Sequence, residues 1–150
     1  MTAVLAPLAG RVLPLQDVPD AVFADALVGP GLAIDPLRGP ADVVSPVSGR
    51  LVKLHPHAFV VVTDEGSGVL VHLGIDTVEL KGEGFRLHVE EGSTVTAGQS
   101  IVSWNPAEIE AGGRSPICPV VALEAKPEAL SELRDTGVVQ AGAPLFMWSG

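Results

Sequence analysis

Two histidines, His57 and His72, are the side chains of this sequence best suited to chemistry. His57 opens the apolar run 57–62, and His72 closes the run 68–72. The Gly- and Asp-containing segment 64–68 predicts a hairpin turn between the two runs. Because both histidines lie at the end of the hairpin away from this turn, their imidazoles can face each other across a shallow pocket. Two facing imidazoles can pass a phosphoryl group or hold a metal ion.

His72 follows a Val-Leu-Val sequence that we expect to be buried on both faces of a sheet. Desolvation would lower its pKa from about 6.5, and a backbone carbonyl or carboxylate bound to one ring nitrogen would leave the lone pair of the other free to attack. Gly74 lets another surface approach closely. Asp76 lies near enough to orient an imidazole and to favour its protonated form, although Asp76 and Thr77 equally suit a turn or helix cap.

The remaining histidines and the cysteine give weaker signals. His55 alternates with His57 and adds a third imidazole at the rim, whereas His88 alternates with polar residues and is expected at the surface. Cys118 lies in an apolar run and is interpreted as a core residue. His55 and His57 also form an H-x-H pair to which His72 could add a third zinc ligand. The alternative to phosphoryl transfer is therefore a zinc-dependent peptidase-like domain with a related all-β fold. No further histidine follows His88, however, to complete such a site.

The elements that must position these residues are mainly strands. The chain contains 17 glycines and 13 prolines that separate short β-branched runs, a pattern typical of all-β proteins. Proline-initiated helices are predicted at 106–111 and 127–135, with one more helical turn at 20–27. The predicted strands are 10–14, 33–36, 42–45, 49–54, 58–63, 68–73, 85–89, 100–104, 117–123 and 144–148.

Two internal echoes suggest a duplication. Residues 6–13 resemble residues 45–52, and residues 91–104 resemble residues 136–148. Each echo is a turn bounded by proline or glycine that leads into a strand. The pattern predicts a sandwich or flattened barrel built from two related β motifs.

Composition limits the function further. At 150 residues the chain is expected to form one domain, 1–150, and its formal net charge of −9 argues against nucleic acid and anionic membranes as partners. No apolar stretch is long enough to insert into a membrane, and a single cysteine fits the cytoplasm. The sequence lacks a Walker-type glycine loop, so any phosphoryl group it handles should come from another phosphoprotein rather than from ATP.

The segment 71–85, which reads VHLGIDTVELKGEGF, resembles the active-site signature of the glucose-type EIIA proteins (EIIA type-1) of the bacterial phosphoenolpyruvate-dependent sugar phosphotransferase system. The resemblance covers about residues 7–148 in the family's order, with a signature core at about 20–124. The other segments that carry it are 19–24, 29–36, 45–49, 57–59 and 115–121.

This resemblance implies an antiparallel β-sandwich of the duplicated hybrid-motif type and a phosphotransferase function. His72 would carry the phosphoryl group on Nε2, and His57 would stabilise it. The phosphocarrier protein HPr would be the donor, and a cysteine of the EIIB domain of a sugar permease the acceptor. The apolar docking positions would be Val22, Phe23, Leu70 and Leu73.

The family also implies what else could bind. No cofactor is required, but zinc can lie between His57 and His72 at a regulatory interface where the partner supplies a further ligand. Regulated permeases or metabolic enzymes are then additional partners, and a regulatory interaction module that transfers nothing is the third interpretation. His55 stands where many family members have a threonine.

Overall fold

The computed structural model describes residues 1–134 and 136–149. In this part of the chain every strand pairing is antiparallel. The strands are β1 (Thr2–Leu5), β2 (Gly10–Pro14), β3 (Gly31–Pro36), β4 (Ala41–Val44), β5 (Gly49–His55), β6 (Ala58–Val62), β7 (Gly68–His72), β8 (Arg86–Leu87), β9 (Thr94–Val95), β10 (Ser100–Trp104), β11 (Cys118–Ala122), β12 (Leu130–Ser131), β13 (Val138–Val139) and β14 (Pro144–Trp148). The helices are α1 (Ala21–Ala24), α2 (Pro106–Ala111) and the 3₁₀ segments η1 (Leu15–Asp17), η2 (Thr77–Leu80) and η3 (Pro127–Ala129).

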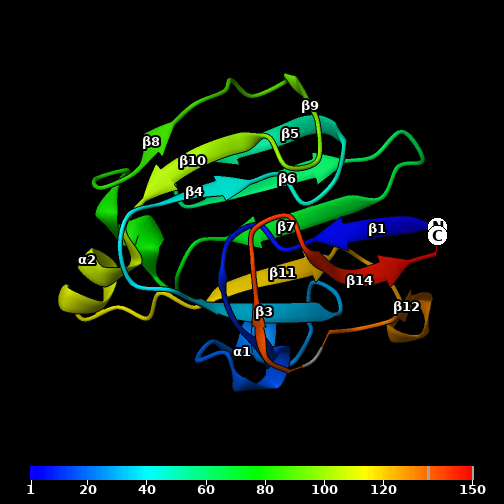
Figure 1. Cartoon of the computed structure of the whole chain (residues 1–150), viewed down its shortest axis with the longest axis horizontal. Coiled ribbons are helices and arrows are strands. Elements are labelled where there is room, and N and C mark those ends of the chain that lie inside the picture. The colour runs from blue at the N-terminus through cyan, green and yellow to red at the C-terminus, as the bar shows by residue number, and fades with distance from the viewer. Residues whose placement is uncertain (135, 150) are drawn as a thin grey trace.

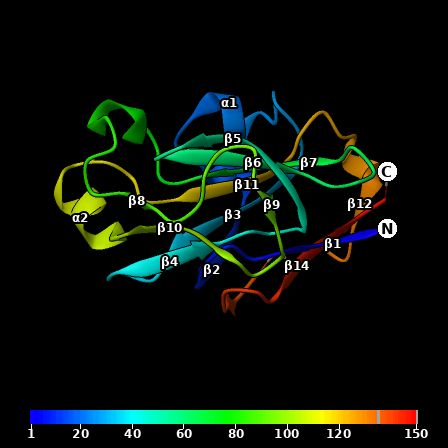
Figure 2. The same ribbon diagram turned by 90° about the horizontal axis from the view of Figure 1, so that it is seen from above.

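The described strands form a sandwich. An eight-stranded sheet has the order β13-β2-β3-β11-β7-β6-β5-β9, and two three-stranded sheets have the orders β1-β14-β12 and β4-β10-β8. The small sheets lie on one side of the large sheet, and α1 lies on the other (Figures 1 and 2). The main core fills the space between the sheets and includes fully buried Phe59, Phe146 and Leu51. The predicted antiparallel β-sandwich is confirmed.

The two internal echoes correspond to two strand sets with the same pairing. The pair β1–β14 with β2–β13 in one set matches β4–β10 with β5–β9 in the other. Even the register agrees, because Gly10 lies opposite Val139 in the first set and Gly49 lies opposite Val95 in the second. The repeated sequence therefore encodes a repeated β motif.

The predicted strands are all present, and three have the predicted bounds. The largest difference is at 85–89, where β8 keeps two residues because it pairs with only two residues of β10. The missed strands are β1, β9, β12 and β13. Three of these contain two residues each, which is too short for a period-2 pattern to show.

The helix predictions had mixed outcomes. Helix α2 has the predicted bounds, and Asn105 caps it by accepting a hydrogen bond from the backbone N–H of Ala107 (3.0 Å). The helical turn at 20–27 shortens to α1, capped by Asp20. The helix predicted at 127–135 is wrong in its described part, because η3 gives way to β12 at Leu130, which pairs with Trp148. Position 135 lies outside the described residues.

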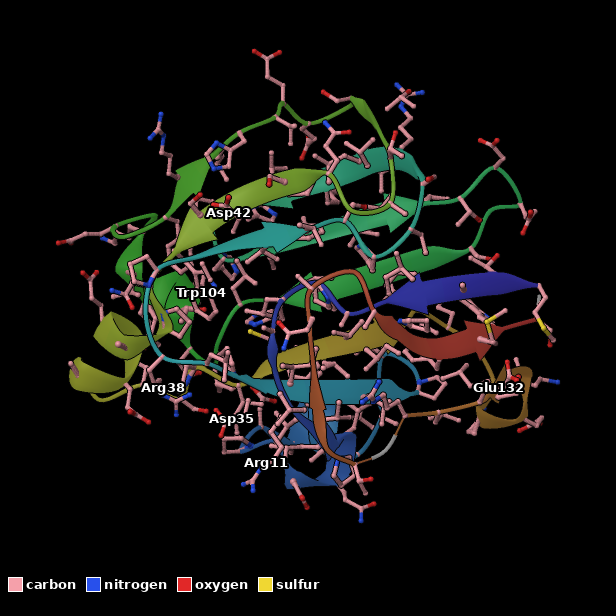
Figure 3. The ribbon with its side chains drawn as sticks, viewed as in Figure 1. Arg11, Asp35, Arg38, Asp42, Trp104 and Glu132 are labelled. Carbon is pink, nitrogen blue, oxygen red and sulfur yellow. The ribbon has the colours of Figure 1, made fainter. Side chains whose placement is uncertain are left out.

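One ion-pair cluster fastens α2 to the end of β3. The guanidinium of Arg38 reaches Asp35 at 2.8 Å and Glu110 at 2.7 Å, in the region that Figure 3 labels. The same ion pair lowers the pKa of Glu110. Cys118 lies in the core, as predicted, and burial raises the pKa of its thiol to about 12. None of the helices in the described residues is long and apolar enough to cross a membrane.

Candidate functional site

Strand β7 presents His72 on the outer face of the large sheet. The side chains of Val69 and Val71 are fully buried between the sheets, whereas Leu70 and His72 lie on the opposite face and are half-buried. The strand is therefore fully buried on its inner face and only partly buried on its outer face. The outer face is partly covered by a second apolar cluster that includes Phe23 of α1.

His57 lies beside His72 because of the local strand pairing. It is the second residue of a two-residue turn between β5 and β6, and Ala58, the next residue, pairs with His72. The backbone N–H of Leu73 also donates to the carbonyl oxygen of His57 (2.7 Å). The ring centroids of His57 and His72 are 5.3 Å apart, with an interplanar angle of 75°. The structure thus brings together the two imidazoles that the hairpin pattern predicted to face each other.

The ring of His72 is anchored by a backbone carbonyl. Its Nδ1–H donates to the carbonyl oxygen of Gly74 at 2.6 Å. Because a carbonyl can only accept, this bond assigns the ring proton to Nδ1 and leaves a lone pair on Nε2. Of the two groups considered for this orienting role, a backbone carbonyl and a carboxylate such as that of Asp76, the structure has the carbonyl of Gly74. The Asp76 side chain is exposed and has no hydrogen bond to either imidazole among the described residues; it acts on His72 through its charge alone.

The loop that carries this carbonyl is tightly held. Gly74 has a φ of 77°, and a Cβ at this position would lie 2.9 Å from the carbonyl oxygen of Ser115. The next residue, Ile75, donates its backbone N–H to the same Ser115 oxygen (2.9 Å). Thr77 Oγ1 donates to the carbonyl oxygen of Leu73 (2.6 Å). These contacts fix the position of the oxygen that orients His72.

The surroundings of His72 favour its neutral form. The Phe23 ring lies 5.1 Å from the His72 ring, centroid to centroid. Burial lowers the pKa of His72, while the bond to Gly74 and the charges of Asp20 and Asp76 oppose this effect without cancelling it. The result is a neutral imidazole with an available Nε2 lone pair at neutral pH.

This charge state can be measured. We expect an NMR titration of the ring signals of His72 to give a pKa below the value of about 6.5 for an unperturbed histidine, because burial penalises the imidazolium. The same titration of the urea-unfolded chain supplies the reference. A folded-state pKa equal to the unfolded value, or above it, would contradict the proposed environment.

Comparisons with known proteins identify the family of the chain. A family model described as the phosphoenolpyruvate-dependent sugar phosphotransferase system, EIIA 1, matches residues 2–127. The chain belongs to this family. It is a glucose-type EIIA, a component of a sugar phosphotransferase system, as its resemblance in sequence predicted.

Two relatives support the assignment. The chain is 42% identical over 120 residues to the PTS system glucose-specific EIIA component of Oceanobacillus iheyensis, covering 79% of this chain and 72% of the relative. Its structure is similar to that of the glucose permease IIA from Mycoplasma capricolum, with a TM-score of 0.88 and 34% sequence identity. This match covers 96% of the present chain and 93% of the Mycoplasma chain.

The four docking positions expected from the EIIA resemblance do not all reach the surface. Val22 is 44% exposed, and Leu70 is half-buried on the outer face. Phe23 is buried, but its ring contacts His72. Leu73 is fully buried among the core side chains and cannot contact a partner, so this expectation is corrected. Its side chain points inward because it follows His72, which points outward.

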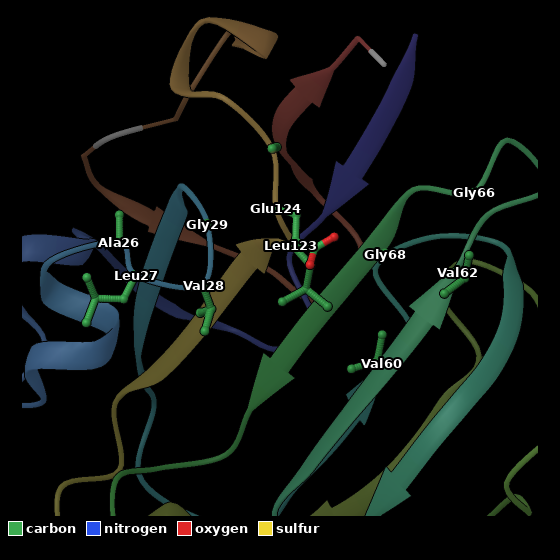
Figure 4. Close-up of a pocket in the computed structure, with 11 residues that line it drawn as sticks. Ala26, Leu27, Val28, Gly29, Val60, Val62, Gly66, Gly68, Leu123 and Glu124 are labelled. Carbon is green, nitrogen blue, oxygen red and sulfur yellow. The ribbon is translucent and has the colours of Figure 1, made fainter.

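Sequence reasoning missed other apolar residues of the same region. Leu27 is 69% exposed and Val78 is 59% exposed. Leu27 lines a groove of about 580 Å³ that also contains Val60, Val62 and Leu123 (Figure 4). Val60 pairs with Leu70, which precedes His72 by two residues on the same face, so the groove continues the face that carries the histidines. Only the three-dimensional strand pairing shows this continuity.

His55 places a third imidazole beside the His57–His72 pair. The ring of His55 stacks on that of His57, with centroids 5.7 Å apart and an interplanar angle of 28°. His88 lies elsewhere and bonds to the hydroxyl of Ser103 (2.5 Å). Among the described residues no group of three or more His, Cys, Asp or Glu side chains could hold a metal ion. The H-x-H pair therefore gives no structural support to the peptidase alternative.

Proposed function

We propose that this EIIA accepts a phosphoryl group on Nε2 of His72 from phosphorylated HPr and passes it to a cysteine in the EIIB domain of a sugar permease. The observation that carries the proposal is the hydrogen bond from Nδ1–H of His72 to the Gly74 carbonyl, which leaves Nε2 as the nucleophile. Family membership supports it, because the family serves a sugar phosphotransferase system.

The two transfers balance without an external oxidant or nucleotide. In the first, the Nε2 lone pair forms an N–P bond as the N–P bond of the donor phosphohistidine breaks, and the electron pair of the broken bond returns to the donor imidazole. In the second, a cysteine thiolate forms an S–P bond while the N–P bond of His72 breaks. Such transfers depend on in-line placement and on stabilisation of the phosphoryl oxygens rather than on a cofactor.

His57 would supply this stabilisation. Its ring lies 5.3 Å from that of His72, near enough for an N–H group to donate to an oxygen of the transferred group. Burial and the charges of His72 and His55 lower the pKa of His57 in the resting protein. A phosphoryl dianion would oppose these effects and favour a donating ring.

The partners would dock on the outer face of the large sheet. Buried Phe23 packs against His72, and the partly exposed Val22 and Leu70 offer apolar surface that a partner can cover, which excludes water from the transfer. The negative charges of Asp20 and Asp76, felt at His72, suit partners with basic residues at this position. The chain would then act in the cytoplasm, together with HPr. Zinc between His57 and His72 would require a ligand from a regulatory partner, because the described residues supply no third one.

The direct test is reconstitution. The chain is incubated with phosphoenolpyruvate, enzyme I and HPr, and the intact protein is analysed by mass spectrometry. We expect one added phosphate that is labile in acid and stable in alkali, located on His72 by fragmentation. A protein that gains no phosphate, or gains it on another residue, would refute the proposed function.

Replacing His57 should slow the transfer to EIIB while leaving the transfer from HPr possible. We expect His57→Gln to accept phosphate but to slow onward transfer to EIIB by about 100-fold, at the low end of the losses found when stabilisation of a developing negative charge is weakened. The reason is that a glutamine amide cannot take up a proton when the phosphoryl charge arrives. Rapid-quench measurement of both steps tests this.

The matched control is His88→Gln, which makes the same chemical change at an exposed histidine outside the site. It should transfer at the rate of the wild type. Unchanged onward transfer in His57→Gln would remove His57 from the proposed mechanism.

A further inference from the structure

We propose that His55 is a positioning residue, whose ring holds His57 in the orientation needed to reach a phosphoryl group on His72. The inference rests on the proposed function and goes beyond it, because it assigns a role to a third imidazole. It follows from a difference in how the two central rings are held.

The rings of His72 and His57 are restrained by different means. Nδ1 of His72 is fixed by the Gly74 carbonyl. The ring of His57 has no hydrogen bond to any of the described residues. Its aromatic contacts within this part of the chain are with His72, edge-on at 75°, and with His55, stacked at 28°. Without His55, one face of the His57 ring would lose this contact and its side-chain torsions would be freer.

The backbone beneath this stack is firmly placed. His55 ends β5 and pairs with Ala58, so that Pro56 and His57 form a two-residue turn. Before the turn, the backbone N–H of Leu54 donates to the carboxylate of Glu91 (2.9 Å). The Cα atoms of His55 and His57 are therefore held, and the remaining freedom lies in the two rings.

The geometry also indicates that the flat ring of His55, and not its charge, holds the ring of His57 in place. A stacked neighbour inclined by 28° hinders rotation of the His57 ring while leaving its edge free to face His72. Positive charge on His55 would instead discourage protonation of His57, since like charges oppose each other. The helpful contribution of His55 is thus the face of its ring, which an uncharged aromatic ring should reproduce.

Two substitutions separate the ring from its charge. His55→Ala removes both, whereas His55→Phe keeps a flat ring and removes the titratable nitrogens. Because His55 is exposed, neither change should disturb the core. We expect both variants to accept phosphate from phospho-HPr at close to the wild-type rate. Onward transfer to EIIB should fall by about tenfold in His55→Ala and stay near wild type in His55→Phe, because only the former frees the His57 ring.

An NMR readout on the unphosphorylated protein completes the test. The ring protons of His57 should show a ring-current contribution from residue 55 in the wild type and in His55→Phe, and only the contribution of His72 should remain in His55→Ala. Wild-type onward transfer in His55→Ala would overturn the inference, as would equal losses in the two variants or an unchanged ring-current shift. If even the wild type took no phosphate on His72, the proposed function would fail, and the NMR comparison would still decide whether the ring of residue 55 stacks on that of His57.

Discussion

A His72→Gln variant incubated with phosphoenolpyruvate, enzyme I and HPr should acquire no acid-labile phosphate. Glutamine has a similar reach and can still donate a hydrogen bond to the Gly74 carbonyl. Its amide nitrogen, however, has no free lone pair with which to attack phosphorus, whereas Nε2 of His72 has one because Nδ1 holds the proton. Intact-protein mass spectrometry should show at least about a 1000-fold loss of the phosphorylated species, as expected when a nucleophile is removed.

The control is again His88→Gln, which should be phosphorylated like the wild type because His88 bonds to Ser103 and lies outside the histidine pair. Circular dichroism should show the same fold for both variants. Wild-type phosphorylation of His72→Gln would mean that another residue, with His57 the first candidate, is the acceptor. The roles proposed for His57 and His72 would then have to be exchanged.

A Gly74→Ala variant should be markedly less stable and also slow to accept phosphate. Gly74 has a φ of 77°, which costs a residue with a side chain about 1–2 kcal/mol. Its Cβ would also lie 2.8 Å from Thr77 Cγ2 and 2.9 Å from the Ser115 carbonyl oxygen, so the loop must shift. We expect urea denaturation to show a total loss of about 3 kcal/mol in the free energy of unfolding. The phosphorylation rate should fall because the displaced carbonyl no longer orients His72.

Gly84→Ala separates the two causes. Gly84 has a similar φ of 87°, but a Cβ added there would meet no atom within 4 Å, so this variant reports backbone strain alone. Its free energy of unfolding should fall by only about 1–2 kcal/mol, the cost of the backbone conformation. Its rate of phosphorylation should equal that of the wild type. Equal losses in the two variants would show that the packing of Gly74 against Ser115 contributes nothing.

The strands of four or more residues, except β1, could be predicted because each contains enough residues for its period to show. The run 10–14 begins with glycine and ends with proline, and the run 100–104 is flanked by Gln99 and Asn105; both have the predicted limits. The helix expected at 127–135 fails because Leu130 and Leu133 also suit a strand edge, and pairing of Leu130 with Trp148 decides between the two. That pairing joins residues far apart in the sequence, which no local pattern records.

The histidine pair could be predicted for a similar reason: one hairpin joins the two residues. The source of the orienting hydrogen bond could not, because a carbonyl leaves no trace in a side-chain pattern. The carboxylate of Asp76 was a candidate for this hydrogen bond, but the backbone carbonyl of Gly74 accepts it from His72. Leu73 was misplaced because a position in a family signature does not tell whether its side chain points toward solvent. In the structure, strand alternation sends it into the core.

The pairing of β1 with β14 places Thr2 opposite Trp148, so the chain enters and leaves the sandwich at the same edge. Strand β7 runs away from this edge, toward the end that bears His72 (Figure 1). The whole unit could therefore be spliced into a surface loop of a host protein, or its ends joined and reopened elsewhere, without stretching the sheets. Tethers at either terminus would leave the end that bears His72 unobstructed.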